Sequence, residues 1–310
     1  MAPVRVAVVD IGTNSTRLLI ADVDAHGAVR EIVRRSEVTR LGEGVDATGR
    51  LAGPAMQRVF AVLEEFREAI DGHGVEANLA VLTSAVRDAV NGAEFTSRVR
   101  DGYGLDARTL PGDEEAAMTF LGACSERAPE GHPIVVIDIG GGSTEFIIGA
   151  GRRASFHVST QAGVVRMTER HIHSDPPRPE ELQDLEADTH AVFGGALPQV
   201  ERGRVTAGIA VAGTATSAAA MELELEPYDP ERVHGHRLLL ATVEMLLARL
   251  ADMSEEERRR VVGLHPARAP TIVAGMILLA EAIRAFGLDA VEVSEHDILR
   301  GGALRLAGLG

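Results

Sequence analysis

The stretch from Pro133 to Ala150 constrains the fold of this chain more than any other. The apolar run 134–137 indicates a buried strand, which ends at Asp138, and a second apolar run begins at Phe146. Between them stand three consecutive glycines, Gly140, Gly141 and Gly142, followed by Ser143. Backbone N–H groups of a turn without Cβ atoms can converge on an anion, so we expect this turn to bind phosphate.

An acid beside a phosphate site points to a cation. Asp138 would repel a bare phosphate, and it fits this position when a divalent cation lies between the two. The alternative is a tight hairpin with an exposed aspartate and no ligand. A second copy of the pattern argues against that alternative, because Asp10–Ala21 reads DIGTNSTRLLIA and Asp138–Gly149 reads DIGGGSTEFIIG. The duplication predicts two related domains that hold phosphates from both sides of a cleft.

Length and charge limit the classes of function. The 310 residues suffice for two domains with buried cores. The formal net charge is −15, and all 31 basic residues are arginine. Non-specific nucleic-acid binding draws on many basic contacts to phosphates, so we expect no nucleic-acid partner. A small polyanionic substrate remains possible, because local backbone donors, a metal ion and a few arginines can reverse the sign of the field inside a cleft.

The single cysteine, Cys124, excludes an internal disulfide and predicts a buried thiol in a reducing cytoplasm. The first apolar run contains Asp10, which argues against a signal peptide. The apolar stretch 269–286 contains Pro270, Glu281 and Arg284, which argues against a membrane span. We therefore expect a cytoplasmic protein without a membrane partner.

The first half of the chain predicts strands at 4–9, 16–23 and 28–35 in a meander, an actin-like opening, then a helix over 54–70 and a strand over 77–83. We expect Ser84 to cap a short helix that carries Arg87 near the carboxyl end of that strand, where ligand loops of open sheets gather. Arg87 is our candidate for a phosphate contact. A surface ion pair with Asp88 or another nearby acid is the alternative.

A cluster of acids opens the next helix. Asp113 is expected to cap it, and Glu114 and Glu115 occupy its first turn. Acids there suit the helix dipole, which is the simpler explanation for them. The dipole also predicts a low pKa, which keeps a carboxylate ionised and able to accept a proton from water.

In the second half we predict strands at 154–160, 205–212 and 291–294, and helices at 163–172, from 180 to beyond 192, and at 218–225, 238–250, 255–262, 270–286 and up to residue 306. The small residues at Gly213 and Thr214 allow a ligand to approach the backbone, or a helix to pack closely on the sheet. The pairs His171/His173 and His234/His236 lack the further ligands that a zinc site needs. The run Arg258–Arg260, which follows three glutamates, is expected to form a solvated, salt-bridged face.

Together these motifs resemble the exopolyphosphatase and guanosine pentaphosphate phosphatase family, within the actin-like, sugar-kinase-like superfamily. The resemblance covers essentially the whole chain. It rests on the segments at 10–15, 83–89, 112–116, 138–145, 212–214 and 294–302. It implies an α/β fold of two actin-like (ribonuclease H-like) domains with a phosphate-binding cleft between them. The domains would span 1–120, completed by the helix 298–310, and 121–297.

The resemblance also implies a role for each motif. Glu115 would be the general base that activates water, Glu145 would help to position that water, and Asp10 and Asp138 would hold Mg²⁺ or Mn²⁺. The phosphate contacts would come from Arg87 and from the loop residues Gly12, Thr13, Asn14, Ser15, Gly140, Gly141, Gly142, Ser143, Gly213 and Thr214. In-line phosphoryl transfer to water needs these components: an oriented nucleophile, donors to the equatorial oxygens and a cation.

Two positions depart from the family pattern. A basic residue often follows the Glu-Glu-Ala segment, where this chain has Ala117 and Met118, and the late motif often reads Arg-Glu-Gly, where this chain has Arg300, Gly301 and Gly302. The first departure predicts the loss of one phosphate contact. The chain resembles the short two-domain members.

The leading hypothesis is therefore a magnesium-dependent hydrolase that removes terminal phosphate from inorganic polyphosphate, with guanosine pentaphosphate as the alternative substrate. Two other hypotheses stay open: an ATP-dependent kinase of the same superfamily, and a catalytically weak regulator that binds polyphosphate or nucleotide. A homodimer is plausible from the resemblance.

Overall fold

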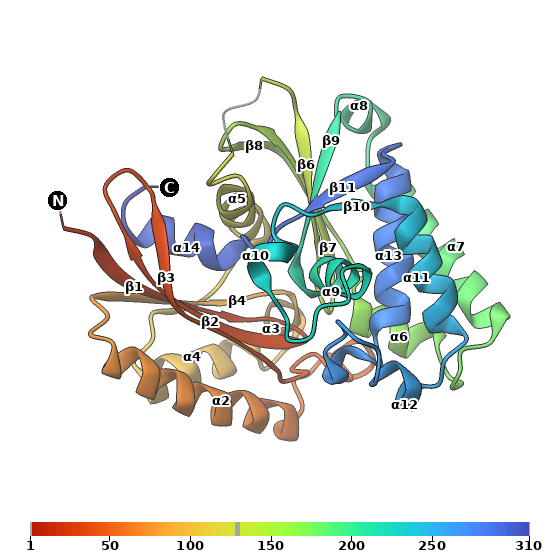
Figure 1. Cartoon of the computed structure of the whole chain (residues 1–310). Coiled ribbons are helices and arrows are strands. Elements are labelled where there is room, and N and C mark those ends of the chain that lie inside the picture. Colours follow the sequence, from red (N-terminus) through yellow and green to blue (C-terminus); the bar gives the residue numbers. More distant parts are fainter. Residues whose placement is uncertain (1, 128–130, 310) are drawn as a thin grey trace. The chain divides into compact units, whose positions relative to one another are not determined.

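The computed structural model describes residues 2–127 and 131–309, which fall into two compact units. Unit 1 comprises Met1–Glu126 together with His296–Gly310, and unit 2 comprises Arg127–Glu295. The C-terminal helix therefore belongs to the same unit as the N-terminal strands (Figure 1). The two units are described in turn.

The sheet of unit 1 has five strands in the order β3-β2-β1-β4-β5. The strands β1 (Val4–Ile11), β2 (Ser15–Val23) and β3 (Val29–Val38) form an antiparallel meander. The strands β4 (Ala77–Leu82) and β5 (Ala107–Thr109) extend it in parallel on the β1 side. Because the carboxyl ends of β1 and β4 lie at one edge of the sheet, the residues that follow them gather there.

Helices cover both faces of this sheet. Side chains alternate along β1, so that Val9 joins the core beneath α2 (Gly53–Gly72) and α4 (Gly92–Tyr103), whereas Val8 joins the core beneath α5 (Gly112–Ala123) and α14 (Ile298–Leu306). The short helices α1 (Val45–Thr48) and α3 (Ser84–Asp88) lie in the connections. Alternation in the sequence thus sorts the apolar residues into two separate cores.

The helices α5 and α14 cross at glycines. A Cβ atom on Gly122 would lie 1.9 Å from the carbonyl oxygen of Asp297, and one on Gly301 would lie 1.9 Å from the carbonyl oxygen of Met118. Real Cβ atoms do not approach backbone this closely, so glycine is required at both positions. A residue larger than Gly301 would push α14 away from α5, the helix that carries Glu115.

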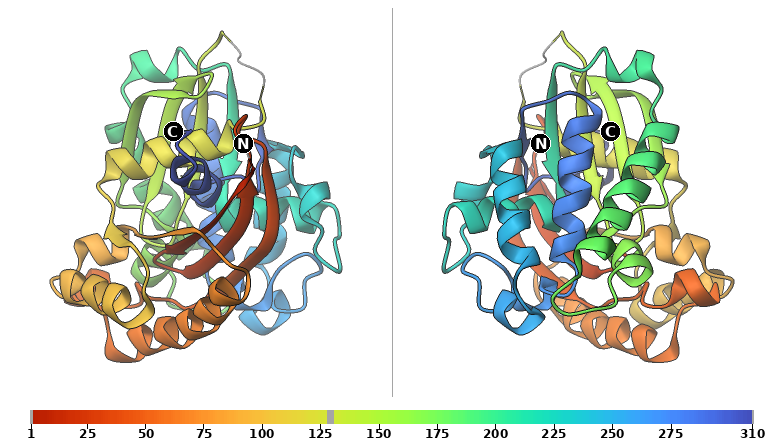
Figure 2. Two further views of the ribbon diagram at one scale, coloured as in Figure 1. Left: turned by 90° about the vertical axis from the view of Figure 1, so that its left-hand side faces the viewer. Right: turned by 90° about the vertical axis from the view of Figure 1, so that its right-hand side faces the viewer.

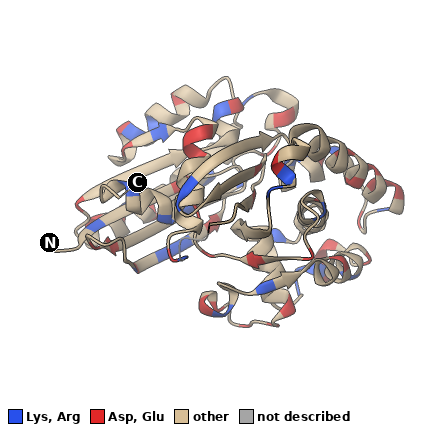
Figure 3. Cartoon of the chain, turned by 90° about the horizontal axis from the view of Figure 1, so that it is seen from above, with Lys and Arg blue, Asp and Glu red and all other residues tan. Residues whose placement is uncertain are grey.

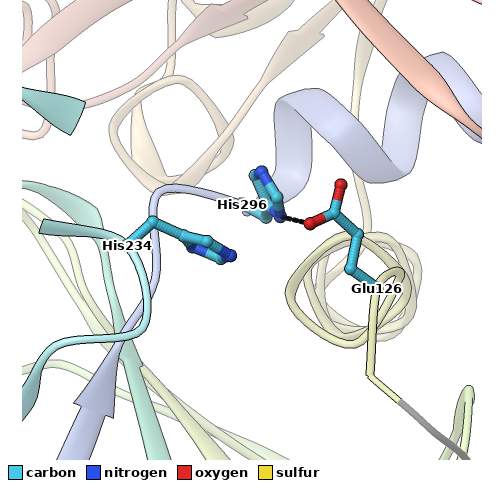
Figure 4. A group of neighbouring side chains, drawn as sticks. All are labelled: Glu126, His234 and His296. Atoms are coloured by element: carbon cyan, nitrogen blue, oxygen red, sulfur yellow. Dashed lines mark ion pairs between the residues drawn. The ribbon is translucent and has the colours of Figure 1, made fainter. Parts of the chain in front are cut away.

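The chain leaves unit 1 after Glu126 and returns to it at His296. These two residues face each other, with His296 Nδ1 3.9 Å from Glu126 Oε2 (Figure 4). The buried Arg300 donates to the Glu126 carboxylate and, through Nε, to Ser125 Oγ at 2.9 Å. Arg300 therefore holds together the segment where the chain leaves unit 1 and the segment where it returns.

Unit 2 repeats the arrangement. Its sheet has the order β10-β11-β9-β6-β7-β8, in which β6 (Ile134–Ile139), β7 (Thr144–Ala150) and β8 (Arg153–Thr160) form the antiparallel meander. The strands β9 (Ala207–Val211) and β11 (Ala290–Val293) run parallel to β6, and β10 (Arg237–Leu239) adds an antiparallel edge. Apart from β10, the strand order equals that of unit 1. The duplicated actin-like α/β fold expected from the paired motifs is thereby confirmed.

The core of unit 2 is built around α13 (Ile272–Ala285), which packs between α7 (Pro179–Ala196) and α11 (Leu240–Ala251) (Figure 2). Arg284 joins the three helices, because it donates to Glu186 on α7, Glu244 on α11 and Glu281 on its own helix. The remaining helices are α6 (Val164–His171), α8 (Gln199–Arg202), α9 (Ala212–Glu222), α10 (Pro230–Val233) and α12 (Glu255–Arg258).

Several local expectations are wrong. The helix predicted over 255–262 ends at Arg258, and this arginine is buried against Asp175 (Nη2 to Oδ1, 3.0 Å), so it does not belong to a solvated face. Arg259 and Arg260 do form i,i+4 pairs with Glu255 and Glu256. The helix α9 begins at Ala212, earlier than predicted, and α1, α4 and β10 were not predicted.

Acidic and basic positions are interspersed along the elements of both units (Figure 3). Within the described residues, every helix is too short or too polar to cross a bilayer. Cys124 is buried and forms no disulfide, as expected.

Candidate active site

Two hairpins of the same geometry carry the duplicated motifs. In unit 1 the backbone N–H of Gly12 donates to the carbonyl of Ser15 at 3.0 Å, and in unit 2 that of Gly140 donates to Ser143 at 2.9 Å. The two aspartates precede these turns, Asp10 near the end of β1 and Asp138 near the end of β6. The likeness seen in the sequence is therefore a likeness of backbone conformation.

The carbonyl groups of both turns are engaged by the surrounding chain. In unit 1, Thr13 O accepts from Gly42 N at 2.8 Å, and Asn14 O accepts from the N–H groups of Thr39 and Arg40. In unit 2, Gly140 O and Gly141 O accept from the first N–H groups of α6 at 2.9 and 2.8 Å, and Gly142 O accepts from Arg166 Nε at 2.8 Å.

Several backbone N–H groups of these turns, unlike the carbonyl groups, have no hydrogen-bond partner among the described residues. No described residue accepts a hydrogen bond from the backbone N–H of Thr13, Asn14, Gly141 or Gly142. Buried backbone donors are normally paired, so donors of this kind at a glycine-rich turn fit an anion from outside the chain. Each unit therefore presents one turn whose carbonyl groups are fixed and whose N–H groups are without an acceptor among the described residues, and anion binding there stays a prediction.

Glu115 and Arg87 meet at the carboxyl edge of the unit 1 sheet. Glu115 lies in the first turn of α5, Arg87 in the last turn of α3, and Arg87 Nη1 donates to Glu115 Oε2 at 2.7 Å and to Leu110 O at 3.1 Å. The acid that pairs with Arg87 here is Glu115, which is buried, and the phosphate contact of Arg87 stays a prediction. Ser84 does not cap α3, because Thr83 occupies the N-cap position. The hydroxyl of Ser84 instead forms a hydrogen bond with Thr13 Oγ1 at 2.9 Å.

Burial raises the pKa of Glu115 above its usual value, and the negative charges of Asp10 and Asp88 raise it further. The hydrogen bond and charge of Arg87 act in the opposite direction without cancelling the effect of burial. The low pKa predicted from the helix dipole is therefore wrong. A buried carboxylate with a raised pKa is a stronger base than an exposed one, which suits proton abstraction from water.

Asp10 is buried and shares Arg17 with Asp297. Arg17 Nε and Nη2 both donate to Asp10 Oδ2, at 2.9 and 2.6 Å, while Nη1 donates to Asp297 Oδ2. Burial raises the pKa of Asp10 despite Arg17. Burial acts the same way on Asp297, but the charges of Arg17 and Arg34 and the hydrogen bonds from Arg17 and Leu299 N–H outweigh it and lower the pKa of Asp297.

In unit 2, Glu145 lies directly across from Asp138 in the β6–β7 ladder. Its side chain is buried, and Oε1 accepts a hydrogen bond from Ser159 Oγ on β8 at 2.8 Å. Ser159 therefore helps to hold the carboxylate in its orientation. Asp138 is half-buried at the carboxyl end of β6.

The junction of β9 and α9 approaches the same edge, because Val211 pairs with Asp138 across the parallel β6–β9 ladder. Ala212 has a φ of 65°, a left-handed conformation that costs energy for a residue with a Cβ atom. Gly213 follows, and a Cβ atom on it would lie 1.7 Å from Arg268 Nη1, so the guanidinium of Arg268 packs directly on the glycine. Gly213 and Thr214 lie in the first turn of α9.

The profile of the Ppx/GppA phosphatase family matches residues 19–305, nearly the whole chain. The chain belongs to the Ppx/GppA phosphatase family. Exopolyphosphatase 2 of Mycobacterium tuberculosis is 38% identical over 99% of this chain and all of its own length. A crystal structure of an exopolyphosphatase-like protein has a TM-score of 0.92 and 35% identity over 99% of this chain and 98% of its own. The Aquifex aeolicus Ppx/GppA family member has a TM-score of 0.83 and 31% identity, covering 98% of both chains.

Within this Ppx/GppA phosphatase, the structure groups the predicted site residues by unit. Unit 1 brings together Asp10, the turn 12–15, Arg87 and Glu115 at the carboxyl ends of β1 and β4. Unit 2 brings together Asp138, the turn 140–143, Glu145 and the start of α9. Of the residues that depart from the family pattern, Ala117 is exposed and Met118 is buried.

Sequence reasoning missed Arg17 and Asp297 as members of the Asp10 cluster. A signal for Arg17 was available, because it lies across from Asp10 as Glu145 lies across from Asp138. Asp297 stands inside the late motif that carried the family resemblance, but nothing in its local sequence points to a partner 280 residues away.

Proposed function

We propose that this protein is an exopolyphosphatase that releases terminal orthophosphate from inorganic polyphosphate by metal-assisted attack of water. The observation that carries the proposal is the buried Glu115, whose pKa is raised and whose carboxylate is oriented by Arg87. Membership of the Ppx/GppA phosphatase family supports it, as does the relative named exopolyphosphatase 2, which matches over its whole length.

In the proposed reaction Glu115 removes a proton from a water molecule while the water oxygen attacks the terminal phosphorus. The new P–O bond forms as the anhydride P–O bond breaks, and the shortened chain leaves with the electron pair of that bond. Glu145, held by Ser159, positions the water. The N–H groups of the two turns and the guanidinium of Arg87 contact the phosphate oxygens.

The residues around Asp10 and Asp138 fit a divalent cation. Both are carboxylates at strand ends, and Asp10 Oδ1 receives no hydrogen bond from any described residue. Oxygen donors are the ligands that Mg²⁺ and Mn²⁺ prefer. When bound, the cation would offset negative charge that develops on the phosphate.

The test is phosphate release with Mg²⁺ from long-chain polyphosphate, short-chain polyphosphate, guanosine pentaphosphate and ATP in parallel. We expect the fastest release from a polyphosphate. Faster release from guanosine pentaphosphate would instead favour a guanosine pentaphosphate phosphohydrolase. Binding without release would favour a regulator, and ATP-dependent phosphorylation of a small acceptor would favour a kinase.

We further propose that the protein acts in the cytoplasm, where its single thiol stays reduced. The homodimer expected from the family resemblance is tested by light scattering on the purified protein.

A further inference from the structure

Asp297 is a buried acid that the proposed chemistry does not use. It is 2% exposed and precedes α14, where its Oδ1 accepts a hydrogen bond from the N–H of Leu299 at 3.0 Å. Its Oδ2 accepts from Arg17 Nη1. Each oxygen of Asp297 therefore accepts a hydrogen bond, one from its own helix and one from Arg17.

The guanidinium of Arg17 stands between Asp297 and Asp10. One edge, formed by Nε and Nη2, contacts a single oxygen of Asp10, and Nη1 contacts Asp297. An arginine can bind both oxygens of one carboxylate through Nε and Nη2, as Arg5 binds Asp22. In Arg17 the same two nitrogens both contact Oδ2 of Asp10, while Asp297 holds Nη1 and so restrains the guanidinium in this orientation. Oδ1 of Asp10 is left without a hydrogen bond from the described residues.

The charges of Arg17, Asp10 and Asp297 also favour cation binding at Asp10. Arg17 alone would neutralise Asp10, and a neutral pair attracts a divalent cation weakly. With Asp297 included, two carboxylates share the one guanidinium of Arg17, so these three hydrogen-bonded side chains together carry a net negative charge, and Arg34 acts on Asp297 from outside this group.

We propose that Asp297 is a positioning residue for cation binding at Asp10: it draws Arg17 to one side, which leaves Asp10 Oδ1 open and the cluster negative. This inference rests on the proposed function, because it assumes that Asp10 binds the cation. It assigns Asp297 a role in metal affinity beyond its role as a helix cap.

The test measures Mn²⁺ binding to the whole protein by electron paramagnetic resonance, without substrate. In Asp297→Asn the side chain keeps its shape and its capping ability but loses the charge. We expect Mn²⁺ affinity to fall about tenfold, as for the loss of one charge near a partly buried site. Asp297→Ser is the second variant. Serine can also cap α14, but it has no carboxylate to contact Arg17, so we expect the same fall in Mn²⁺ affinity.

Asp22→Asn is the matched control. Asp22 is also a buried carboxylate of unit 1 shared by two arginines, Arg5 (Nε to Oδ1, 2.7 Å) and Arg30, but it lies near the other end of β2 from Arg17. Its substitution should leave Mn²⁺ affinity unchanged. An equal fall in this control would overturn the inference, because it would show a general effect of lost charge or stability.

Asp10→Asn separates the inference from the proposed function. If wild type binds Mn²⁺, Asp10→Asn does not, and both Asp297 variants bind as wild type does, the role of Asp297 is refuted and the cation site stands. If Asp10→Asn binds as well as wild type, or wild type binds no Mn²⁺, the cation site fails and the inference fails with it.

Discussion

Arg87 and Glu115 form a direct ion pair, with Nη1 2.7 Å from Oε2, at the carboxyl edge of the unit 1 sheet. The pair joins the end of one helix, α3, to the first turn of another, α5. It holds the proposed base in one orientation, and its positive charge limits how far burial raises the pKa of Glu115. The predictions on activity follow from this pair and from the hydrogen bond between Ser159 and Glu145 in unit 2.

The pH dependence of hydrolysis should reveal the raised pKa of Glu115. A base acts only when ionised, so kcat/KM should fall as the pH drops through that pKa. Because the pKa is raised, this fall should begin at a higher pH than for an ordinary glutamate, whose pKa is about 4.3. Arg87→Met should move the acid limb to still higher pH, because Arg87 lowers the pKa. An acid limb that stays in place in this variant would contradict the assigned interaction.

Ser159→Ala should slow hydrolysis modestly. The serine donates the hydrogen bond that orients Glu145, and losing one such bond is worth about 0.5–1.5 kcal/mol, roughly a 2- to 10-fold loss in kcat. Ser155→Ala is the matched control on the same strand, because Ser155 Oγ donates only to a backbone carbonyl, Ile148 O, at 3.2 Å. Steady-state kinetics of both variants decide the matter, and equal rates would refute the role of Ser159.

Gly301→Ala should destabilise unit 1. The added Cβ atom would lie 1.9 Å from Met118 O, and forcing extra atoms into a packed contact typically costs about 1–3 kcal/mol. Gly102→Ala is the control, because Gly102 lies in α4 with no atom within 4 Å of the added Cβ, and alanine favours helix. In denaturant unfolding, the free energy of unfolding should fall in Gly301→Ala and rise slightly in Gly102→Ala. A stable Gly301→Ala protein would mean that α5 and α14 are not tightly packed.

The sequence predicts the fold well where a local pattern decides it. Apolar runs that end in Asp10 and Asp138 give the first strand of each sheet, and the glycine turns give the hairpins, because strand period and turn chemistry are local. The same is true of α13, whose apolar stripe is nearly all buried.

Prediction fails where distant parts of the chain decide the environment. The helix dipole is local and predicts a low pKa for Glu115, whereas the burial that raises it comes from the packed unit. Arg258 stands in a run of charges typical of a surface, yet its side chain is buried and donates to Asp175. The contact between Arg17 and Asp297 spans 280 residues, and no local period or motif encodes it.

The most direct test of the central claim compares Glu115→Gln with wild type in Mg²⁺-dependent phosphate release from long-chain polyphosphate. Loss of a general base typically lowers the rate by about 10²- to 10⁴-fold, and we expect kcat to fall by this amount while polyphosphate is still bound. Glu114→Gln, an exposed neighbour in the same helical turn, should remain active. Unchanged turnover in Glu115→Gln, or an equal loss in Glu114→Gln, would contradict the assignment of Glu115 as the base.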